Sequence, residues 1–192
     1  VKLRSGVTFH DGTPFNADAV INTFNCIKDP DFGSTRASLA SSIESMEAPD
    51  ENTVVFHLSY PDGVFLAKLS HVNSAIVSPT AQQNQDLMVQ PCGTGPYKFV
   101  SAVSGSNVVL TRNDDYWGQK AQIKDVTYTV ITEESTALSR LETGEADLMP
   151  SITVENLSRV EAMPNVTLAT ADTAQIYYMV LRPNSYVNPL MA

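Results

Sequence analysis

The chain has 192 residues, of which 43% are hydrophobic and 17% charged, which is the composition of a folded protein rather than a disordered one. Its net charge of −9, with no lysine- or arginine-rich run, would repel phosphate backbones and argues against a nucleic-acid partner. The longest apolar run, Ile176–Leu181, is far shorter than the roughly 20 residues that a membrane-spanning helix needs.

The two cysteines, Cys26 and Cys92, do not form a recognisable metal or redox motif. They lack the CxxC spacing of zinc proteins, and no group of histidines accompanies them. We interpret them as two separate, buried small apolar residues. A disulfide between them stays open, because spacing does not decide the geometry of such a bond. We expect no metal and no cofactor.

The segment Phe9–Val20 contains the neighbours His10 and Asp11, which could begin a metal site or a catalytic dyad. The following letters, DGTP, are typical of a turn, because glycine tolerates positive φ and proline fixes its own φ. Asn16 then stands where a helix N-cap belongs, and apolar residues recur at helical spacing over Ala17–Ile27. The other histidines form no motif with His10. We therefore interpret the pair as part of a turn that leads into a helix.

Alternating apolar residues predict a β-hairpin over residues 43–58, with its turn at PDEN. A short helix is expected over residues 61–70, with Val64, Phe65 and Leu69 buried and Leu66 as a further candidate. A brief strand at Ser74–Pro79 and a polar helix or loop follow.

The sharpest change in composition lies at Gln90–Val100, where two prolines and two glycines precede an alternating strand. The letters GTG are no phosphate loop, because no GK[ST] follows and Pro96 lacks a backbone donor. A second hairpin is expected to return over Asn107–Asn113. In the DDYWG turn that comes next, we interpret the paired aspartates as a solvated loop and Trp117 as a cover for the core edge.

The second half of the sequence predicts an open α/β sheet in the order βα-βα-β. The first half is a smaller α+β unit ahead of it, with the boundary at Pro91–Gly95. In the second half we expect a strand at 125–131, a helix capped by Thr132 and ended by Gly144, a strand at 146–149, a helix at Thr153–Met163, and strands at 165–170 and 175–183.

Four stretches, LRSGVTFHDGTPFNADAV, QPCGTGPYKFV, LTRNDDYWG and ALSRLETGEADLM, together resemble one family. It is the peptide/nickel-type, or family 5, solute-binding proteins of bacterial ABC importers. The resemblance covers nearly the whole chain in the right order. It implies a mixed α/β fold, namely a lobe of the type II, peptide-binding class of periplasmic binding proteins with an inserted small α+β subdomain. Residues 1–92 would be that subdomain and residues 93–192 part of the main sheet of the first lobe, in a fragment that lacks the second lobe.

The resemblance further implies a receptor without catalytic residues, which captures di- or oligopeptides between two lobes and delivers them to membrane permease subunits. It would act in the periplasm or, as a lipoprotein, at the cell surface. A nickel-chelate or other small-solute receptor is the alternative within the family, although the segment KLSHVNSAIVSP lacks the arginine or tryptophan expected there. A ligand-sensing domain of a transcriptional regulator and an α/β hydrolase built on His10 and Asp11 also stay open.

Ligand-binding side chains are expected on loops at strand ends, where they would supply hydrogen bonds and aromatic walls. Ordinary packing is the alternative for each of them, and two adjacent tyrosines cannot face the same side of a strand. A truncated lobe that exposes an apolar face also leaves self-association open. The expected ligand-binding residues are His71, Asn73, Ser74, Thr94, Tyr177, Tyr178 and Asn184.

Overall fold

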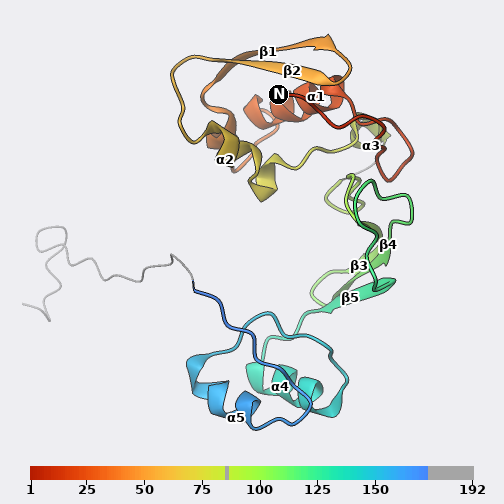
Figure 1. Cartoon of the computed structure of the whole chain (residues 1–192), viewed down its shortest axis with the longest axis vertical. Helices are drawn as coiled ribbons and strands as arrows, with labels where there is room; N and C mark the ends of the chain where they lie inside the picture. Colours follow the sequence, from red (N-terminus) through yellow and green to blue (C-terminus); the bar gives the residue numbers. More distant parts are fainter. Residues whose placement is uncertain (85–86, 173–192) are drawn as a thin grey trace, which may run out of the picture. The chain divides into compact units, whose positions relative to one another are not determined.

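The computed structural model describes residues 1–84 and 87–172 (Figure 1). The chain divides into two compact units, Val1–Val130 and Ile131–Ala192, each with a hydrophobic core of its own. This division differs from the boundary between residues 92 and 93 that the resemblance implies. The boundary between residues 92 and 93 refers to the domains of a longer protein, and it remains a prediction.

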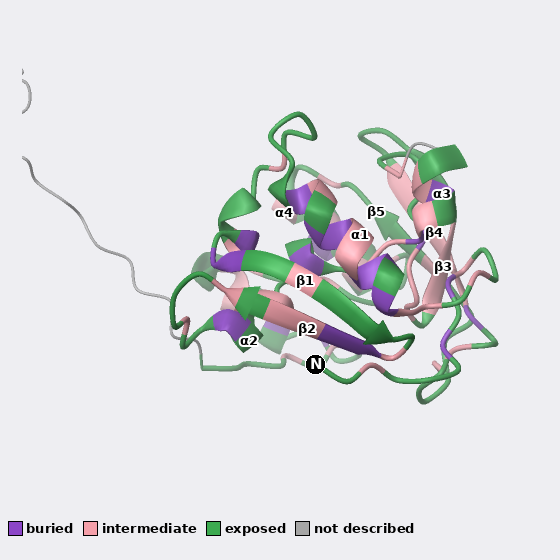
Figure 2. Cartoon of the chain, turned by 90° about the horizontal axis from the view of Figure 1, so that it is seen from above, coloured by how far each residue is buried: buried purple, intermediate pink, exposed green. Residues whose placement is uncertain are grey.

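The first unit is built around helix α1 (Ala17–Lys28), which packs against an antiparallel hairpin of β1 (Ile43–Asp50) and β2 (Thr53–Leu58) (Figure 2). The helix begins after Asn16, whose side-chain oxygen accepts a hydrogen bond from the Ala19 N–H at 3.0 Å. The predicted turn, helix and hairpin are thus confirmed. The buried apolar residues of this core are Ala17, Val20, Phe24, Ile27, Ala40, Ile43, Val54 and Phe65.

Short helical segments complete this part of the unit. The predicted helix near residue 65 is present, but only Phe65 is buried and Leu69 is half-buried, whereas Val64 and Leu66 are exposed. The expected burial of Val64 was wrong because a single helical turn presents little more than one side chain to the core. The segments are η1 (Ala37–Ala40), α2 (Phe65–Leu69), η2 (Val72–Ser74) and α3 (Pro79–Asn84).

The strand predicted at Ser74–Pro79 is wrong, because its last residues start helix α3. The Ser78 hydroxyl oxygen accepts a hydrogen bond from the Ala81 N–H at 3.1 Å, as an N-cap does. Pro79 is the first helical residue, a position where the missing N–H of proline has no cost. Within the described part of the chain, residues 75–78 pair with no strand.

A three-stranded antiparallel sheet closes the first unit, with β3 (Tyr97–Val103), β4 (Asn107–Arg112) and β5 (Asp125–Thr129) in that order. The predicted hairpin and the strand near residue 125 are confirmed. None of the residues in these strands is buried, and β3 and β5 are both edge strands in the described chain. The sheet therefore has neither a covering layer nor a paired border within the residues described.

The second unit contains α4 (Glu134–Thr143), the 3-10 turn η3 (Val154–Asn156) and α5 (Leu157–Glu161) around a small apolar core. Helix α4 ends at Gly144, as predicted, with a left-handed φ of 77°. The expected cap at Thr132 is wrong, since Glu133 occupies the N-cap position without a side-chain hydrogen bond. Leu138, Val160 and Met163 form the buried core.

The open α/β sheet predicted for the second half is absent from the described residues. The expected strands at 146–149 and 165–170 have no strand conformation, because a β-strand exists only when a neighbour supplies its hydrogen bonds. The helix predicted at Thr153–Met163 is shorter and opens with η3. The strand expected at 175–183 lies outside the described residues. In the described part of the chain, we find no helix with the length and hydrophobicity needed to span a membrane.

Candidate functional site

The His10–Asp11 pair forms a turn, as the sequence predicts. The Asp11 carboxylate accepts hydrogen bonds from the Thr13 N–H at 2.9 Å and the Thr13 hydroxyl at 2.6 Å. It also accepts one from the Ser78 hydroxyl at 2.5 Å. The His10 Nε2 lies 3.0 Å from the Gly95 carbonyl oxygen, which can only accept, so Nε2 is the donor. Both side chains are therefore engaged in joining three chain segments.

The hydrogen bonds at Asp11 also set its protonation. Burial acts to raise the pKa of this carboxyl, but the bonds from Ser78, Thr13 and Cys92 outweigh it and hold the pKa below its ordinary value. Burial raises the pKa of the Cys92 thiol. A thiol of raised pKa beside a carboxylate is a poor nucleophile, so this corner does not have the character of a catalytic centre.

The segment Gly93–Pro96 accepts a hydrogen bond at every one of its four carbonyl groups. The Gly93 oxygen accepts from the His10 backbone N–H at 2.9 Å. The Gly95 oxygen accepts from the His10 ring and from the Asn113 side-chain amide at 3.2 Å. The Pro96 oxygen accepts from the Asn113 backbone N–H at 2.8 Å. The GTGP turn is thus fixed from both sides, by the residue-10 turn and by the end of β4.

The fourth carbonyl in this segment, that of Thr94, accepts a hydrogen bond from the Trp117 indole N–H at 3.0 Å. The guanidinium carbon of Arg4 lies 4.5 Å from the Trp117 ring centroid, within cation–π distance. The sequence predicted Trp117 only as a cover for the core edge, but the residue is 44% exposed and belongs to none of the core clusters of the described residues. A donor role is nevertheless consistent with its indole, because a partly buried tryptophan N–H usually finds an acceptor.

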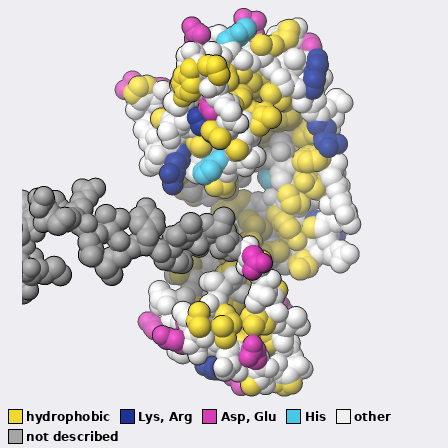
Figure 3. Space-filling model, turned by 60° about the vertical axis from the view of Figure 1, so that its left-hand side comes forward, with side chains coloured by type: hydrophobic (Ala, Val, Ile, Leu, Met, Phe, Trp, Pro, Cys, Tyr) yellow, Lys and Arg dark blue, Asp and Glu magenta, His cyan; other side chains and the backbone are white. Residues whose placement is uncertain are grey.

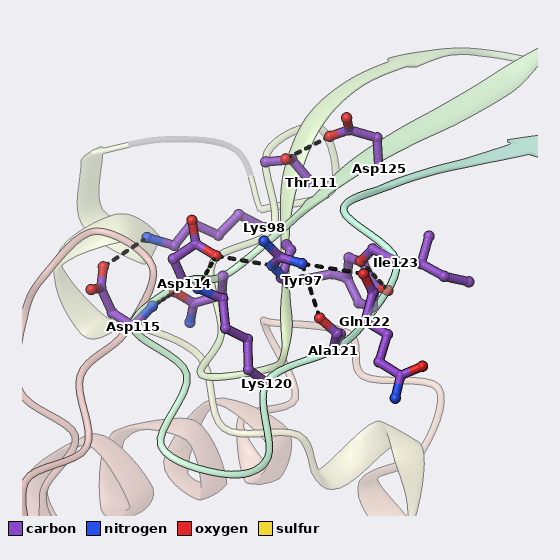
Figure 4. A network of polar contacts seen from close by, with 12 residues as sticks. Tyr97, Lys98, Thr111, Asp114, Asp115, Lys120, Ala121, Gln122, Ile123 and Asp125 are labelled. Carbon is purple, nitrogen blue, oxygen red and sulfur yellow. Dashed lines mark hydrogen bonds and ion pairs between the residues drawn. The ribbon is translucent and has the colours of Figure 1, made fainter.

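The paired aspartates of the DDYWG turn lie in a solvated polar network, as predicted (Figure 4). The Asp114 carboxylate contacts the Lys120 ammonium at 2.7 Å and the Arg112 guanidinium at 2.9 Å. These two cations lower the pKa of Asp114 from 3.8 to about 2. Asp115 points to a different partner, Lys98, at 3.8 Å. The two carboxylates therefore do not converge on a shared proton or metal.

The turn that carries three of the expected ligand-binding residues is η2 and its N-cap. The His71 Nδ1 accepts a hydrogen bond from the Asn73 backbone N–H at 3.1 Å. The Ser74 hydroxyl is buried and donates to the Lys68 carbonyl at 2.8 Å. The Asn73 side-chain amide has no hydrogen-bond partner among residues 1–84 and 87–172. Asn73 and the free Nε2 of His71 are therefore the groups of this turn that a ligand could use.

The structure brings the chain after this turn beside the segment that leads to Thr94. The Ser78 N–H donates to the Cys92 carbonyl at 3.1 Å. A Cβ placed on Gly93 would lie 4.0 Å from the Ile76 carbonyl oxygen, so the two backbones run close together. The Thr94 hydroxyl itself has no partner in the described ranges. Tyr177, Tyr178 and Asn184 lie outside the described residues, and all seven assignments remain predictions.

A shallow hollow of about 300 Å³ lies next to the residue-10 turn, but it contains none of the expected ligand-binding residues. Its lining residues are His10, Asp11, Gln90, Pro91, Cys92, Lys98, Phe99 and Val100.

No group of three or more metal-ligating side chains occurs among the described residues. Both cysteines are free thiols. Their expected burial is confirmed for Cys92, whereas Cys26 is only half-buried and accepts a hydrogen bond from the Gln82 amide at 2.9 Å.

Comparisons with known proteins agree on the class of fold. The chain is 31% identical to a chain of the periplasmic binding protein DppA from Helicobacter pylori, solved with the peptide STSA. The match has a TM-score of 0.76 and covers 85% of this chain and 37% of that one. NikZ from Campylobacter jejuni, solved with Ni(L-His), is 26% identical with a TM-score of 0.77, over 85% and 34% of the two chains. The fold is therefore that of part of a type II periplasmic binding protein.

Sequence comparison narrows this class to a family. Residues 1–191 match the family model of bacterial extracellular solute-binding proteins, family 5. The glutathione-binding protein GsiB of Pectobacterium atrosepticum is 32% identical over 174 residues, which are 89% of this chain and 34% of that protein. The chain belongs to the family 5 solute-binding proteins. It spans about a third of the length of the relatives that it matches.

Proposed function

We propose that the chain is part of the substrate-binding component of an ABC importer, which captures di- or oligopeptides. The supporting observation is its family membership over residues 1–191, together with the likeness to DppA, whose structure contains a peptide. Such a receptor performs no chemistry. It buries its ligand between two lobes and presents the closed form to a permease. The expected location is outside the cytoplasm, in the periplasm or at the cell surface.

Two turns among the described residues have the fixed backbone that one wall of a binding cleft would need. The GTGP turn is fixed through its carbonyl groups, so the Thr94 hydroxyl is presented from a backbone that has little freedom. His71 and Asn73 stand on a turn whose conformation is closed by its own hydrogen bond. Groups that are held in place before the ligand arrives lose little entropy on binding, which favours affinity.

The proposal is tested on the longer protein that we expect to contain this chain. Isothermal titration calorimetry with di-, tri- and pentapeptides, glutathione and Ni(L-His) compares the ligand classes directly. We expect peptides to bind at least tenfold more tightly than Ni(L-His). The proposal fails if no peptide binds and another solute does. Mass spectrometry of small molecules released from the purified protein identifies the natural ligand independently.

The isolated 192-residue chain is expected to bind the same peptides far more weakly than the longer protein. The second lobe would supply about half of the ligand contacts, and without closure water stays in contact with the ligand. A nanomolar dissociation constant for the isolated chain would show that the site is complete without a second lobe.

A nickel-chelate receptor is the second candidate, because NikZ with Ni(L-His) is among the similar structures. The described residues hold no cluster of metal-ligating side chains, so the metal would have to enter already chelated. Titration with Ni(L-His) and with histidine alone separates recognition of the chelate from recognition of the amino acid. Tight binding of the chelate with no binding of peptides would favour this candidate.

A further inference from the structure

Asp62 and Lys68 form the most buried ion pair among the described residues, at helix α2 of the first unit. The Lys68 ammonium lies 2.6 Å from the Asp62 carboxylate, and the Asp62 side chain is only 5% exposed. The same carboxylate accepts hydrogen bonds from the Ser42 hydroxyl at 2.7 Å and from the Val64 N–H at 3.1 Å. Ser42 is fully buried and directly precedes β1. The pair therefore ties α2 to the buried start of the β1–β2 hairpin.

Both members of this pair are charged near neutral pH. Hydrogen bonds from Lys68 and then from Ser42 lower the pKa of Asp62, and the bond to Asp62 raises the pKa of Lys68. The Lys2–Asp50 pair of the same unit differs, since its side chains are 78% and 55% exposed and lie 3.6 Å apart. Water screens such an exposed pair, so it contributes little to fixing the chain.

The backbone of Lys68 carries the turn that follows helix α2. Its carbonyl oxygen accepts hydrogen bonds from the His71 N–H at 3.2 Å and from the Ser74 hydroxyl at 2.8 Å. Helix α2 has only five residues, and a helix of this length has little stability of its own. Phe65 and Leu69 pack it against the core, and the ion pair is its charged anchor. The position of the turn therefore depends on how firmly Lys68 is held.

The turn presents two polar side chains to solvent and keeps a third for itself. Histidine side chains reach the surface of the first unit (Figure 3), and both His71 and Asn73 are exposed. Because the His71 Nδ1 accepts from the Asn73 N–H, a neutral ring carries its proton on Nε2, which is then a donor. Ser74 is only 4% exposed, and its hydroxyl donates to the Lys68 carbonyl.

We propose that Asp62 and Lys68 are positioning residues of the ligand-binding site. They hold the turn so that His71 and Asn73 are in place to donate hydrogen bonds to the ligand. This inference rests on the proposed function, because it takes the turn as part of the site. Ser74 then acts on the turn rather than on the ligand. A turn that is fixed in advance loses little entropy when the ligand binds, which favours affinity.

Calorimetry on the longer protein tests this role. The probe is whichever solute binds most tightly among the di-, tri- and pentapeptides, glutathione and Ni(L-His). Lys68→Met keeps an unbranched side chain but removes the ammonium, and we expect it to weaken binding about tenfold. Lys68→Arg retains the charge and should restore most of the affinity. Lys2→Met, at the exposed pair, is the matched control and should leave affinity within about twofold.

A double-mutant cycle separates positioning from a general loss of stability. In a background that carries His71→Ala and Asn73→Ala, Lys68→Met should change affinity by less than about twofold, because the groups that it positions are gone. An equal loss in both backgrounds would overturn the proposal, and so would unchanged affinity in the otherwise unaltered protein. If Lys68→Met does not fold, Asp62→Asn replaces it, since asparagine keeps the size of the side chain and an acceptor oxygen.

Hydrogen exchange without ligand examines the turn directly in the longer protein. The Asn73 and Ser74 amides both have acceptors within the turn. Lys68→Met should accelerate their exchange about tenfold and leave the amides of α1 unchanged. Unchanged protection at Asn73 and Ser74 would overturn the proposal even if no tested solute binds. The proposed function fails separately, when no peptide binds the unaltered protein and another solute does, and the cycle then uses that solute.

Discussion

The indole N–H of Trp117 donates to the carbonyl oxygen of Thr94, 3.0 Å away and 23 residues earlier in the chain. This bond joins the DDYWG turn to the GTGP turn. Together with the bonds from His10 and Asn113, it links three of the stretches by which the sequence resembles its family. The residues of these motifs therefore hydrogen-bond to one another, which gives them a structural role.

The first prediction concerns that indole. Trp117→Phe keeps an aromatic ring but removes the donor to Thr94, and we expect a loss of about 1 kcal/mol in the free energy of unfolding. Urea denaturation followed by circular dichroism measures it. Tyr128→Phe, at an exposed residue of β5, is the control and should change the free energy little. Equal values for the two variants would mean that the indole bond adds nothing to stability.

The second prediction separates a structural role of His10 from a catalytic one. His10→Ala removes the bond to Gly95 and should cost about 1 kcal/mol of stability. Peptide affinity in the longer protein should stay within about twofold, since the ring is engaged with backbone. His57→Ala, which removes an exposed contact with Glu47, serves as control with a smaller loss. A hydrolytic activity that disappears with His10 would contradict this interpretation.

The third prediction is the acid dependence of the Asp114 network. The pKa of Asp114 falls from 3.8 to about 2, chiefly through Lys120 and then Arg112. A carboxyl with a lowered folded-state pKa contributes stability that is fully present above its unfolded pKa and is lost as pH falls through the folded one. Asp114→Asn should therefore flatten the decline in melting temperature between about pH 4 and pH 2.

The neighbouring Asp115 provides the control for this measurement. Its carboxylate is 3.8 Å from Lys98 and is largely exposed, so the pair should add little. Melting curves of Asp115→Asn should follow those of the unchanged chain across the same pH range. An acid decline that Asp114→Asn leaves intact would assign the loss to other carboxyls, with Asp11 the first to examine, because its pKa is also lowered.

The fourth prediction tests the end of α4. Gly144 has a φ of 77°, which side chains with a Cβ adopt only at a cost. Gly144→Ala should destabilise the second unit by about 1 kcal/mol. Gly144→Asn should cost less, because asparagine tolerates this conformation better. Hydrogen exchange of the α4 amides measures both variants. A Cβ at Gly144 would meet no atom within 4 Å, so an equal cost for the two variants would contradict the explanation by backbone strain.

The fifth prediction addresses ligand binding. Asn73→Ala should weaken peptide affinity of the longer protein by about tenfold, the loss of one hydrogen bond to the ligand. Its stability should not change, since the side-chain amide has no partner within the described ranges. Asn84→Ala, at the exposed last residue of α3, is the matched control. Unchanged affinity for Asn73→Ala would remove this residue from the site.

Local signals predicted the first unit well because its elements are stabilised by neighbours in sequence. Asn16 caps α1 three residues from its bond partner, and Asp11 closes its turn within two residues. The hairpins likewise pair adjacent strands. Such short-range hydrogen bonds follow from the residue types themselves, so the spacing of apolar and turn residues was sufficient.

The failures have more than one physical origin, and the first is that some elements depend on partners distant in the sequence. The strands expected at 146–149 and 165–170 need neighbours that are absent from the described residues. The apolar pattern at 74–79 is shared by helix starts and strands, and Ser78 and Pro79 decided for the helix. The donor role of Trp117 depends on a contact across 23 residues, which no local pattern encodes.

The four hydrogen-bonded carbonyl groups of Gly93–Pro96 limit where this protein can tolerate inserted residues. One extra residue there would displace the carbonyl oxygens from their donors, so the hydrogen bonds from Trp117, His10 and Asn113 could not all form. By contrast, the exposed Ser104 and Gly105 at the tip of the β3–β4 hairpin bond to nothing in the described chain. Natural relatives and engineered fusions should therefore accept added sequence at that tip and reject it at the glycine–proline corner.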